Sequence, residues 1–469
     1  MEERKKLSNK TIIGYGIGAV ADASAYNFVI MYMLFYLTTV AGMKSVSAGL
    51  AIGIATILQA VLGLIIGPLS DNTRSKYGRR RPYILAGGIL LFISMFLLFR
   101  VNDFNDTGKF VYYLIMMSMF WISYMTFVTP YNALGSEMTL DYNERTKLRT
   151  PATILNGVGE IIGMSLPLAV IAMFTSQGAS DAAGWGYFTL MLGAFCLITI
   201  LIMWKMTKGK ELPPEMFKKE EKDKNPLKTY WEILKLKPFK WIMGFGIMFY
   251  IGYIAFQSGL TYFALYCVGL SETQVSSLVL ISVLLMMAMT MGISILANKI
   301  GKTYAMGASF LFTAVGFIVM GIIGVHSYGM FLVLFVIFQV ANGAFWLLLY
   351  PITYDVSEVY DYKYGKRREA SILSIMALIA SLAAALGTQI LAVALHFAGF
   401  DATAAVQSAS TVKGISMIVL GIPVVACIIA SVFCFLNPMT KHKYEKLVEQ
   451  LERKKAGEEP DETGLERLI

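Results

Sequence analysis

Two carboxylates stand inside long apolar stretches of this sequence, where ionisable side chains are costly and usually functional. Asp22 lies about a third of the way into one stretch, with Tyr26 one helical turn further on. Glu160 lies in the first half of another, with Asn156 one turn before it. A carboxyl group in a low-dielectric cavity can take up and release a proton, so we consider both acids as proton-coupling candidates. The alternative for each is a structural acid that is hydrogen-bonded to a neighbouring helix or lies near the membrane interface.

Amide and phenol groups on the same kind of stretch could bind the hydroxyl groups of a polar solute. Such solutes bind to an aromatic face and to a few convergent polar groups. The candidate solute ligands here are Asp22, Tyr26, Asn27, Tyr131, Asn132, Gln257, Tyr350 and Tyr354. Aromatic residues in membrane spans more often pack or face lipid, and that alternative stays open for each tyrosine.

The segment 67–82 places a carboxylate beside a tight turn crowded with guanidinium groups. Asp71 follows Gly67-Pro68-Leu69-Ser70, and the run Gly78-Arg79-Arg80-Arg81-Pro82 comes after it. Such a cluster can clamp neighbouring helix ends in one state of a protein and release them in another. A positively charged loop without a switching role is the alternative.

The elements that must position these residues are membrane-spanning helices. Of the 469 residues, 56% are hydrophobic and 15% are charged, which is too little charge to cover a soluble protein of this length. Twelve apolar stretches are long enough to cross about 30 Å of hydrocarbon. Their approximate bounds are 11–40, 46–70, 83–102, 110–135, 153–175, 185–206, 240–267, 272–298, 303–325, 328–354, 370–398 and 412–436. The fold class is therefore an all-α membrane protein.

Basic residues concentrate in alternate loops and predict the orientation of the chain. Lysines and arginines are frequent in 71–82, 136–152 and 358–369 and almost absent from the alternate loops near 41–45, 176–184, 268–272 and 399–411. By the positive-inside rule both termini are cytoplasmic, and we expect a multi-pass protein of the bacterial inner (plasma) membrane. The net charge of +9 follows from this bias, so no nucleic-acid partner is expected. The N-terminus leads directly into a long first span, which argues against a cleavable signal peptide.

The two halves of the sequence repeat each other. Spans one and seven match at an offset of 230 residues, and spans four and ten at an offset of 221. The matched pairs include Gly14 with Gly244, Gly16 with Gly246, Asn27 with Gln257, Tyr36 with Tyr266, Pro130 with Pro351, and Glu137 with Glu358. Parallel repeats of six helices joined by a polar linker are typical of the major facilitator fold, whose two pseudo-symmetric halves rock around a central site.

This repeat divides the chain into four parts. We expect an N-terminal half at 1–206, a cytoplasmic linker at 207–239, a C-terminal half at 240–436 and a cytoplasmic tail at 437–469. The linker segment KTYWEILK should form a surface helix. The tail begins as a basic helix and becomes acidic, so we expect disorder near 456–463.

Other classes of protein find little support in the sequence. The four cysteines all fall within spans, and the three histidines are too scattered to form a metal site. A nucleophile–base set and a nucleotide-binding loop are both absent, so we expect neither an enzyme nor a bound cofactor. A transporter-like sensor remains a minor alternative, although the linker and tail are short.

The loop 67–82 resembles the hallmark loop of the major facilitator superfamily, in the form found in the glycoside–pentoside–hexuronide:cation symporters and the related sucrose transporters. Similarity to melibiose and glucuronide permeases extends along most of the chain. It rests on the loop and on weaker matches in the right order, namely Tyr15-Gly16-Ile17-Gly18-Ala19, Pro130-Tyr131, Leu140-Asp141-Tyr142-Asn143-Glu144-Arg145, Phe345-Trp346-Leu347-Leu348 and Asp355-Val356-Ser357-Glu358.

The resemblance implies further site residues. Trp346 matches the aromatic platform on which the family binds the sugar ring. The family's acidic pair and the repeat suggest gating contacts at the cytoplasmic helix ends, in addition to the cluster of Asp71, Arg79 and Arg80. In these, Arg145 would pair with Asp355 or Glu358, and Glu137 with Lys366, Arg367 or Arg368.

The sequence also departs from the family. The two helix-two aspartates that bind Na⁺ or H⁺ in the family's sugar symporters correspond to Gln59 and Gly63. The family's charged sugar ligands correspond to Ala23, Val128, Thr153 and Leu382. The melibiose-type cation site is therefore absent.

Together these features predict a secondary active transporter that moves a glycoside or related small polar solute by alternating access. Proton coupling is preferred to Na⁺ coupling. A uniporter and a transporter of a lipid-like or amphipathic solute are the alternatives. The expected partners are the solute and the lipid bilayer, and the family norm is a monomer.

Overall fold

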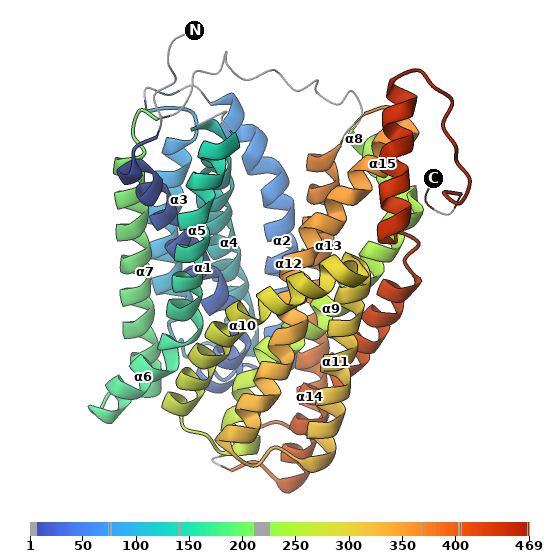
Figure 1. The fold of residues 1–469 in the computed structure, drawn as a ribbon. Coiled ribbons are helices and arrows are strands. Elements are labelled where there is room, and N and C mark those ends of the chain that lie inside the picture. Colours follow the sequence, from blue (N-terminus) through green and yellow to red (C-terminus); the bar gives the residue numbers. More distant parts are fainter. Residues whose placement is uncertain are drawn as a thin grey trace. The chain divides into compact units, whose positions relative to one another are not determined.

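The structure is a computed structural model that describes residues 7–73, 75, 77–138, 142–210, 226–366, 368–401, 404, 406–466 and 468. Within these ranges, the side chains at positions 64, 68, 71, 72, 136, 137, 142–146, 149, 226, 227, 287, 369 and 370 lie outside the description. Every regular element in the described part of the chain is a helix (Figure 1).

The helices follow one another with short connections. They are α1 (Asn9–Phe35), η1 (Tyr36–Val40), α2 (Ser45–Asn72), α3 (Arg81–Leu98), α4 (Asp106–Glu137), α5 (Tyr142–Met164), α6 (Leu166–Ser176), α7 (Asp181–Met206), α8 (Pro226–Lys235), α9 (Lys237–Tyr262), η3 (Phe263–Val268), α10 (Glu272–Ile300), α11 (Lys302–Ile323), α12 (Tyr328–Tyr364), α13 (Glu369–Phe397), α14 (Ala409–Leu436) and α15 (Lys441–Lys455). Several begin at a side-chain cap. The hydroxyl groups of Ser8, Ser180 and Ser327 and the Oδ1 atom of Asn105 each accept a hydrogen bond from a backbone N–H of the first turn.

Twelve of these segments are long and apolar enough to span a membrane, as predicted. The first and seventh spans both end in π-helical turns, η1 and η3, which fits the repeat. The fifth span consists of α5 and α6 and is interrupted at Ser165, directly before Leu166-Pro167. Pro130 in α4 and Pro351 in α12 occupy matched positions of the repeat.

Contacts divide the chain into two units. Unit 1 contains residues 1–220, 269–280 and 392–411, and unit 2 contains 221–268, 281–391 and 412–469. The division into halves, linker and tail at the residues expected from the sequence stays a prediction.

Small residues bring the helices of unit 1 into close contact. α1 packs against α5 and α7, and α3 against α4 (Figure 1). A Cβ atom at Gly159 would lie 2.6 Å from the Val20 carbonyl oxygen, and one at Gly163 would lie 2.4 Å from that of Ser24. Glycine on α5 therefore allows the backbones of α1 and α5 to touch, a common way for membrane helices to associate.

Unit 2 is held by packed aromatic rings on α9, α11 and α12. Phe249 stacks on Phe310 with ring centroids 4.7 Å apart and lies 4.5 Å from Phe345. Phe256 lies 4.2 Å from Phe338. These contacts fix the register between α9 and α12, the two helices that carry the candidate solute ligands of this unit.

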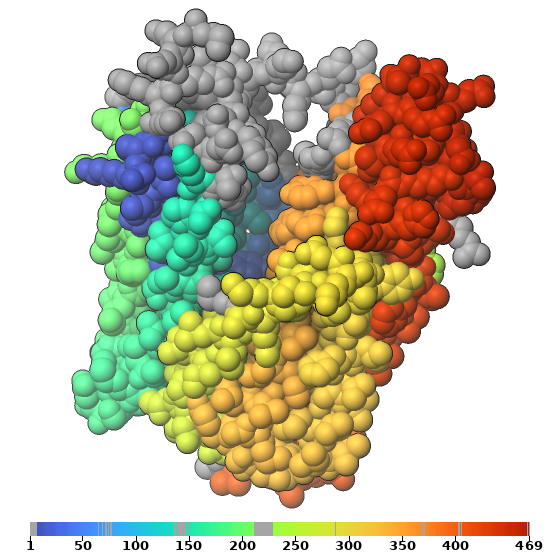
Figure 2. Space-filling view, in the orientation of Figure 1, coloured from blue at the N-terminus to red at the C-terminus, as the bar shows by residue number. Residues whose placement is uncertain are grey.

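The predicted surface helix of the linker is confirmed as α8, which is tied to the end of α12 by a 2.7 Å hydrogen bond from the Tyr360 hydroxyl to Glu232. Disorder near 456–463 was expected and is not what the structure shows. After α15 the chain folds back along that helix, and Leu465 and Leu468 are buried. Figure 2 shows α15 and the following residues, in red, gathered in one block.

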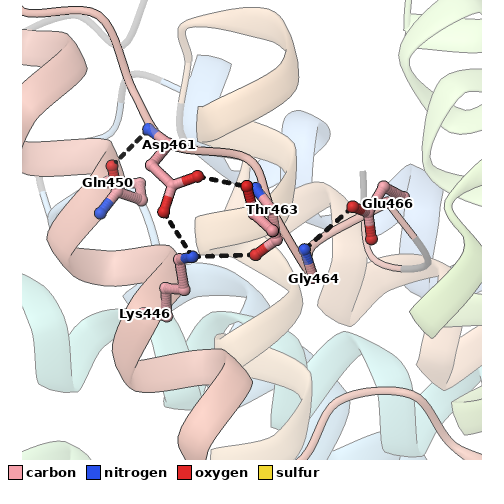
Figure 3. A network of polar contacts seen from close by, with 6 residues as sticks. All are labelled: Lys446, Gln450, Asp461, Thr463, Gly464 and Glu466. Carbon is pink, nitrogen blue, oxygen red and sulfur yellow. Dashed lines mark hydrogen bonds and ion pairs between the residues drawn. The ribbon is translucent and has the colours of Figure 1, made fainter.

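Polar contacts explain this ordered tail (Figure 3). Lys446 of α15 donates to the Asp461 carboxylate at 2.7 Å, and the Asp461 backbone N–H donates to Gln450 Oε1 at 2.7 Å. Disorder was predicted from the acidic composition of 456–463 alone. That prediction did not include the basic and amide side chains of α15, which bind this acidic segment.

Candidate functional site

Asp22 lies near the middle of the 32-residue span Asn9–Val40 and hydrogen-bonds to a neighbouring helix. The Tyr124 hydroxyl of α4 donates to Asp22 Oδ1 at 2.6 Å. Asp22 forms no ion pair with a described lysine or arginine. Its polar partner is the Tyr124 phenol, which is uncharged. A carboxylate in this setting lacks the fixed positive charge that would hold it permanently ionised.

An aromatic cluster surrounds this hydrogen bond. Tyr26 lies one turn beyond Asp22, and its ring centroid is 5.8 Å from that of Tyr124 and 5.9 Å from that of Trp121. The Trp121 indole is buried, and its Nε1–H has no hydrogen-bond partner in the part of the chain that the structure describes. Buried indole N–H groups usually have a partner, so Trp121 is an additional candidate for binding a polar group.

Sequence reasoning missed Trp121 and Tyr124. Both lie on the fourth apolar span at the spacing i, i+3, which places them on one helix face. The signal was present in the aromatic run, but the sequence does not say which face of span four meets Asp22.

Glu160 is half-buried on α5 and has no hydrogen bond or ion pair to another described residue. It follows Gly159, which touches α1 at Val20 and Ala23. The two carboxylates therefore lie at the same level along α1 and α5, near the middle of their spans. The structure thus places both proton-coupling candidates in one unit.

Three other predicted ligands of unit 1 have different surroundings. Asn27 is half-buried, and its side-chain amide donates to the Ala23 carbonyl of its own helix at 2.9 Å. Tyr131 is buried, stacks on Tyr15 at 4.8 Å and donates its hydroxyl to the Tyr15 carbonyl at 3.1 Å. Asn132 is exposed. Whether these residues bind a solute stays a prediction, although Tyr131 has the contacts of a packing residue.

In unit 2 the predicted aromatic residues share one face of α12. Trp346, Tyr350 and Tyr354 are spaced by four residues and are 37%, 47% and 45% exposed. Their exposure contrasts with that of Phe345 and Leu348 of the same helix, which are buried. The three rings therefore form an aromatic stripe that is accessible to a solute or to lipid.

The first ring of the stripe is fixed by α9. The Trp346 ring packs edge-on against Tyr250 at 6.1 Å and Tyr253 at 6.4 Å. Gln257, one turn beyond Tyr253, is buried. Tyr250 and Tyr253 were not predicted as site residues, because the sequence alone does not show that they support Trp346.

A buried amide pair continues the same face of α12 and was also missed. Asn342, four residues before Trp346, donates to Gln339 Oε1 at 2.9 Å, and Gln339 is 3.5 Å from Ser282 Oγ. The Asn342 Oδ1 atom is buried without a partner. Buried amides inside an apolar span are costly unless satisfied, so Asn342 is an additional candidate for binding a hydroxyl group.

The basic loop is partly described. Arg80 is buried and donates to Ser70 Oγ at 3.1 Å, which joins the ends of α2 and α3, and Arg79 is half-buried. Arg81, which was not predicted as a gating residue, lies 4.3 Å from the centre of the Trp204 ring and donates to Thr207 at 3.3 Å. The predicted gating residue Asp71 falls outside the described side chains.

At the corresponding end of unit 2, Asp355 pairs with Lys302 at the start of α11. Both carboxylate oxygens lie 2.8 Å from the Lys302 ammonium. Glu358 is half-buried. The predicted partners Glu137, Arg145 and Arg367 lie outside the described side chains, so the gating pairs stay predictions.

Comparison with known proteins identifies the family. A family described as MFS/sugar transport protein matches residues 14–441. The chain belongs to this family. It is 26% identical over 462 residues to the uncharacterized symporter YnaJ of Bacillus subtilis, covering 97% of this chain and 96% of YnaJ. It is 23% identical over 468 residues to the glucuronide carrier protein homolog of Escherichia coli, covering 96% and 97% of the two chains.

The fold of this MFS protein is shared with solved transporters. A bacterial homolog of the human lysosomal transporter Spinster superposes with a TM-score of 0.70 at 16% identity, covering 91% of this chain and 96% of that one. The resemblance to glycoside–pentoside–hexuronide:cation symporters expected from the loop motif is confirmed. The protein is a multi-pass membrane transporter of the major facilitator fold and not an enzyme.

Proposed function

We propose that this secondary transporter moves a glycoside or related small polar solute together with a proton by alternating access. The observation that carries the proposal is Asp22, a carboxyl group near the middle of a span that accepts a hydrogen bond from the Tyr124 hydroxyl. A group of this kind can exist protonated or ionised during a transport cycle, because no described cation on a neighbouring helix pairs with it. Glu160 on α5 is the second candidate.

The solute class is supported by the chemistry of α12. A sugar ring has an apolar C–H face that packs on an indole and hydroxyl groups that bind amides and phenols. Trp346 supplies the indole, and Tyr350, Tyr354 and Asn342 supply polar groups on the same helix face. A glucuronide carrier homolog among the relatives supports the same class.

A proton is favoured over Na⁺ as the coupling ion. A sodium site needs several oxygen ligands around one point, and the helix-two positions that bear aspartates in the family's sugar symporters are Gln59 and Gly63 here. A single carboxyl group is sufficient to bind a proton. Proton coupling therefore requires only residues that the chain has.

Alternating access would open and close the end of the bundle that carries the basic loops. In the sequence, Asp71, Arg79 and Arg80 lie in the basic loop 71–82, and the acids Asp355 and Glu358 lie where the basic loop 358–369 begins. By the positive-inside rule this end faces the cytoplasm, with both termini, and the membrane is the bacterial inner membrane. We propose a monomer as the transporting unit.

Uptake into proteoliposomes tests the proposal. The panel contains radiolabelled glycosides, glucuronides and lysophospholipids, each with an imposed proton gradient, a Na⁺ gradient or neither. Accumulation of a glycoside or glucuronide with the proton gradient alone supports the proposal. Equilibration under every gradient would identify a uniporter. Transport of lysophospholipids alone would favour an amphipathic solute, an outcome consistent with the loss of the family's charged sugar ligands at Val128, Thr153 and Leu382.

A further inference from the structure

A cavity of about 690 Å³ opens at one end of unit 2, away from the aromatic stripe and the buried amides of α12. It is formed by the first turns of α9 and α11, the last turn of α14 and the segment that leads into α15. The lining residues are Lys237, Lys240, Trp241, Tyr304, Phe433, Phe435, Leu436, Asn437, Pro438, Thr440 and Lys443. Because two spans begin and one ends here, the cavity lies at the level where hydrocarbon meets lipid headgroups.

The polar part of the cavity is strongly basic. Lys240 is exposed and Lys443 is half-buried, and neither makes an ion pair within 4 Å to a described carboxylate. Lys237 donates to the Glu466 carbonyl oxygen at 2.7 Å. Three ammonium groups around one cavity repel one another, and an anion bound between them would relieve that repulsion.

Backbone and amide donors add to this preference for an anion. The helices α9 and α11 begin at the cavity without a side-chain cap, so their first N–H groups and dipoles favour negative charge. Asn437 is only 3% exposed, and its Nδ2 group has no hydrogen-bond partner among the described residues. A buried amide donor of this kind in the wall of a basic cavity can donate a hydrogen bond to an oxygen atom of an anion.

One carboxylate lies close to these lysines. The Glu466 carboxylate accepts a hydrogen bond from the Gly464 N–H at 2.9 Å (Figure 3). This bond, with smaller contributions from Lys443 and Lys446, holds the pKa of the Glu466 carboxyl below its usual value. The Glu466 carboxylate neutralises part of the positive charge at the cavity. Because three lysines line the cavity, the net charge there is still positive.

The remaining walls are apolar and continue onto the lipid-facing surface. The ring centroids of Trp241 and Phe433 are 5.8 Å apart, and those of Tyr304 and Phe435 are 6.0 Å apart. Leu436 is 58% exposed. A water-soluble anion gains nothing from these walls, whereas a phospholipid places its phosphate among the lysines and its acyl chains against the exposed face of α14. We propose that this cavity is a binding site for one anionic phospholipid, independent of the solute pathway.

Native mass spectrometry of the full-length, delipidated protein tests this site. The ligands are phosphatidylglycerol and phosphatidylethanolamine with identical acyl chains, and inorganic phosphate as the water-soluble anion. The test variant is Lys240→Gln/Lys443→Gln, and the matched control is Lys205→Gln/Lys208→Gln, which removes two exposed lysines from the end of α7 in unit 1. We expect one phosphatidylglycerol to bind the wild type and the control equally. The test variant should bind it about 30-fold more weakly, since each of the two lysines contributes about fivefold.

Three results would overturn the proposal. These are equal binding of phosphatidylglycerol by the test and control variants, equal binding of the two lipids by the wild type, and displacement of the lipid by millimolar phosphate, which would indicate a free-anion site. If the double variant does not fold, Lys240→Gln alone decides the matter because this side chain is exposed. Its binding should weaken about fivefold, and unchanged binding would refute the site.

Discussion

Replacing Asp22 by asparagine should abolish its contribution to proton-driven accumulation and leave solute exchange intact. Asparagine has the same shape, and its Oδ1 atom can accept the hydrogen bond that Tyr124 donates at 2.6 Å. The contact between α1 and α4 is therefore kept. Because an amide does not take up a proton in the physiological range, this proton-binding group is removed without loss of the fold.

The size of the effect follows from the number of carboxyl groups that can carry protons. Among the described spans, Asp22 and Glu160 are the acids near the middle of a span without a cationic partner, whereas Asp355 is paired with Lys302. One proton per solute allows about tenfold accumulation per unit of pH gradient, and two protons allow about 100-fold. Asp22→Asn should lower the accumulation ratio by about tenfold, either from ten to one or from 100 to ten.

The assay is uptake into proteoliposomes with one pH unit across the membrane and the electrical potential clamped at zero. Glu160→Gln is measured in parallel, and Asp106→Asn is the matched control because it neutralises an exposed acid paired with Lys44 at the start of α4. Counterflow of labelled solute without a gradient measures exchange. If Asp22→Asn accumulates solute as the wild type does, Asp22 is a structural acid and the reasoning is refuted. If exchange is lost as well, Asp22 acts as a solute ligand.

Three further predictions concern unit 2. Trp346→Ala should raise the solute KM about tenfold because the indole face is lost, whereas Trp346→Phe keeps an aromatic ring and should raise KM much less. Equal KM values for the two variants in uptake assays would contradict this prediction. Lys302→Met should lower the free energy of unfolding by about 2 kcal/mol, less than for a fully buried pair because Lys302 is partly exposed. Unfolding in SDS-containing mixed micelles measures this, and a double variant with Asp355→Asn should recover most of the loss. Hydrogen bonds from Lys446 and Thr463 lower the pKa of the Asp461 carboxyl below its usual value of 3.8, so its stabilisation of the folded tail is present above that pH and lost as the pH falls below it. Limited proteolysis after α15 should therefore accelerate below about pH 4, and Asp461→Asn should cleave at the fast rate at every pH.

The sequence predicted the features that have a one-dimensional signal. The length of each apolar stretch located all twelve spans, and the matches at fixed offsets indicated the two-fold repeat that the major facilitator fold requires. Asp22 and Glu160 were found because an acid inside an apolar run is conspicuous. Trp346 was found by family resemblance.

Partners that depend on helix rotation could not be predicted. Tyr124 meets Asp22 from 102 residues away, and nothing in the order of residues says which face of α4 contacts α1. Lys302 pairs with Asp355 across 53 residues for the same reason. Asn342 was not predicted because the sequence does not show that it shares a helix face with Trp346 and meets Gln339 in the interior.

The repeat yields two equivalent helix pairs with different chemistry. At the offset of 221, Trp121 of α4 corresponds to Asn342 of α12, and each has a buried polar atom without a partner. Yet the carboxyl group belongs to the pair α1–α4 and the exposed aromatic stripe to the pair α9–α12. We infer that unit 1 binds the proton and that unit 2 contributes most of the solute affinity.

This division of roles makes a prediction about a double variant. If protons bind in one unit and solute mainly in the other, the two functions are lost independently, since sites without shared partners behave additively. Asp22→Asn should lower accumulation with little change in KM, and Trp346→Ala should raise KM with an unchanged accumulation ratio. The combined variant should show both defects at their single-variant sizes, measured by uptake over a range of solute concentrations with and without the pH gradient. A combined defect much larger or smaller than their product would mean that proton and solute share ligands, and the division between the units would then be wrong.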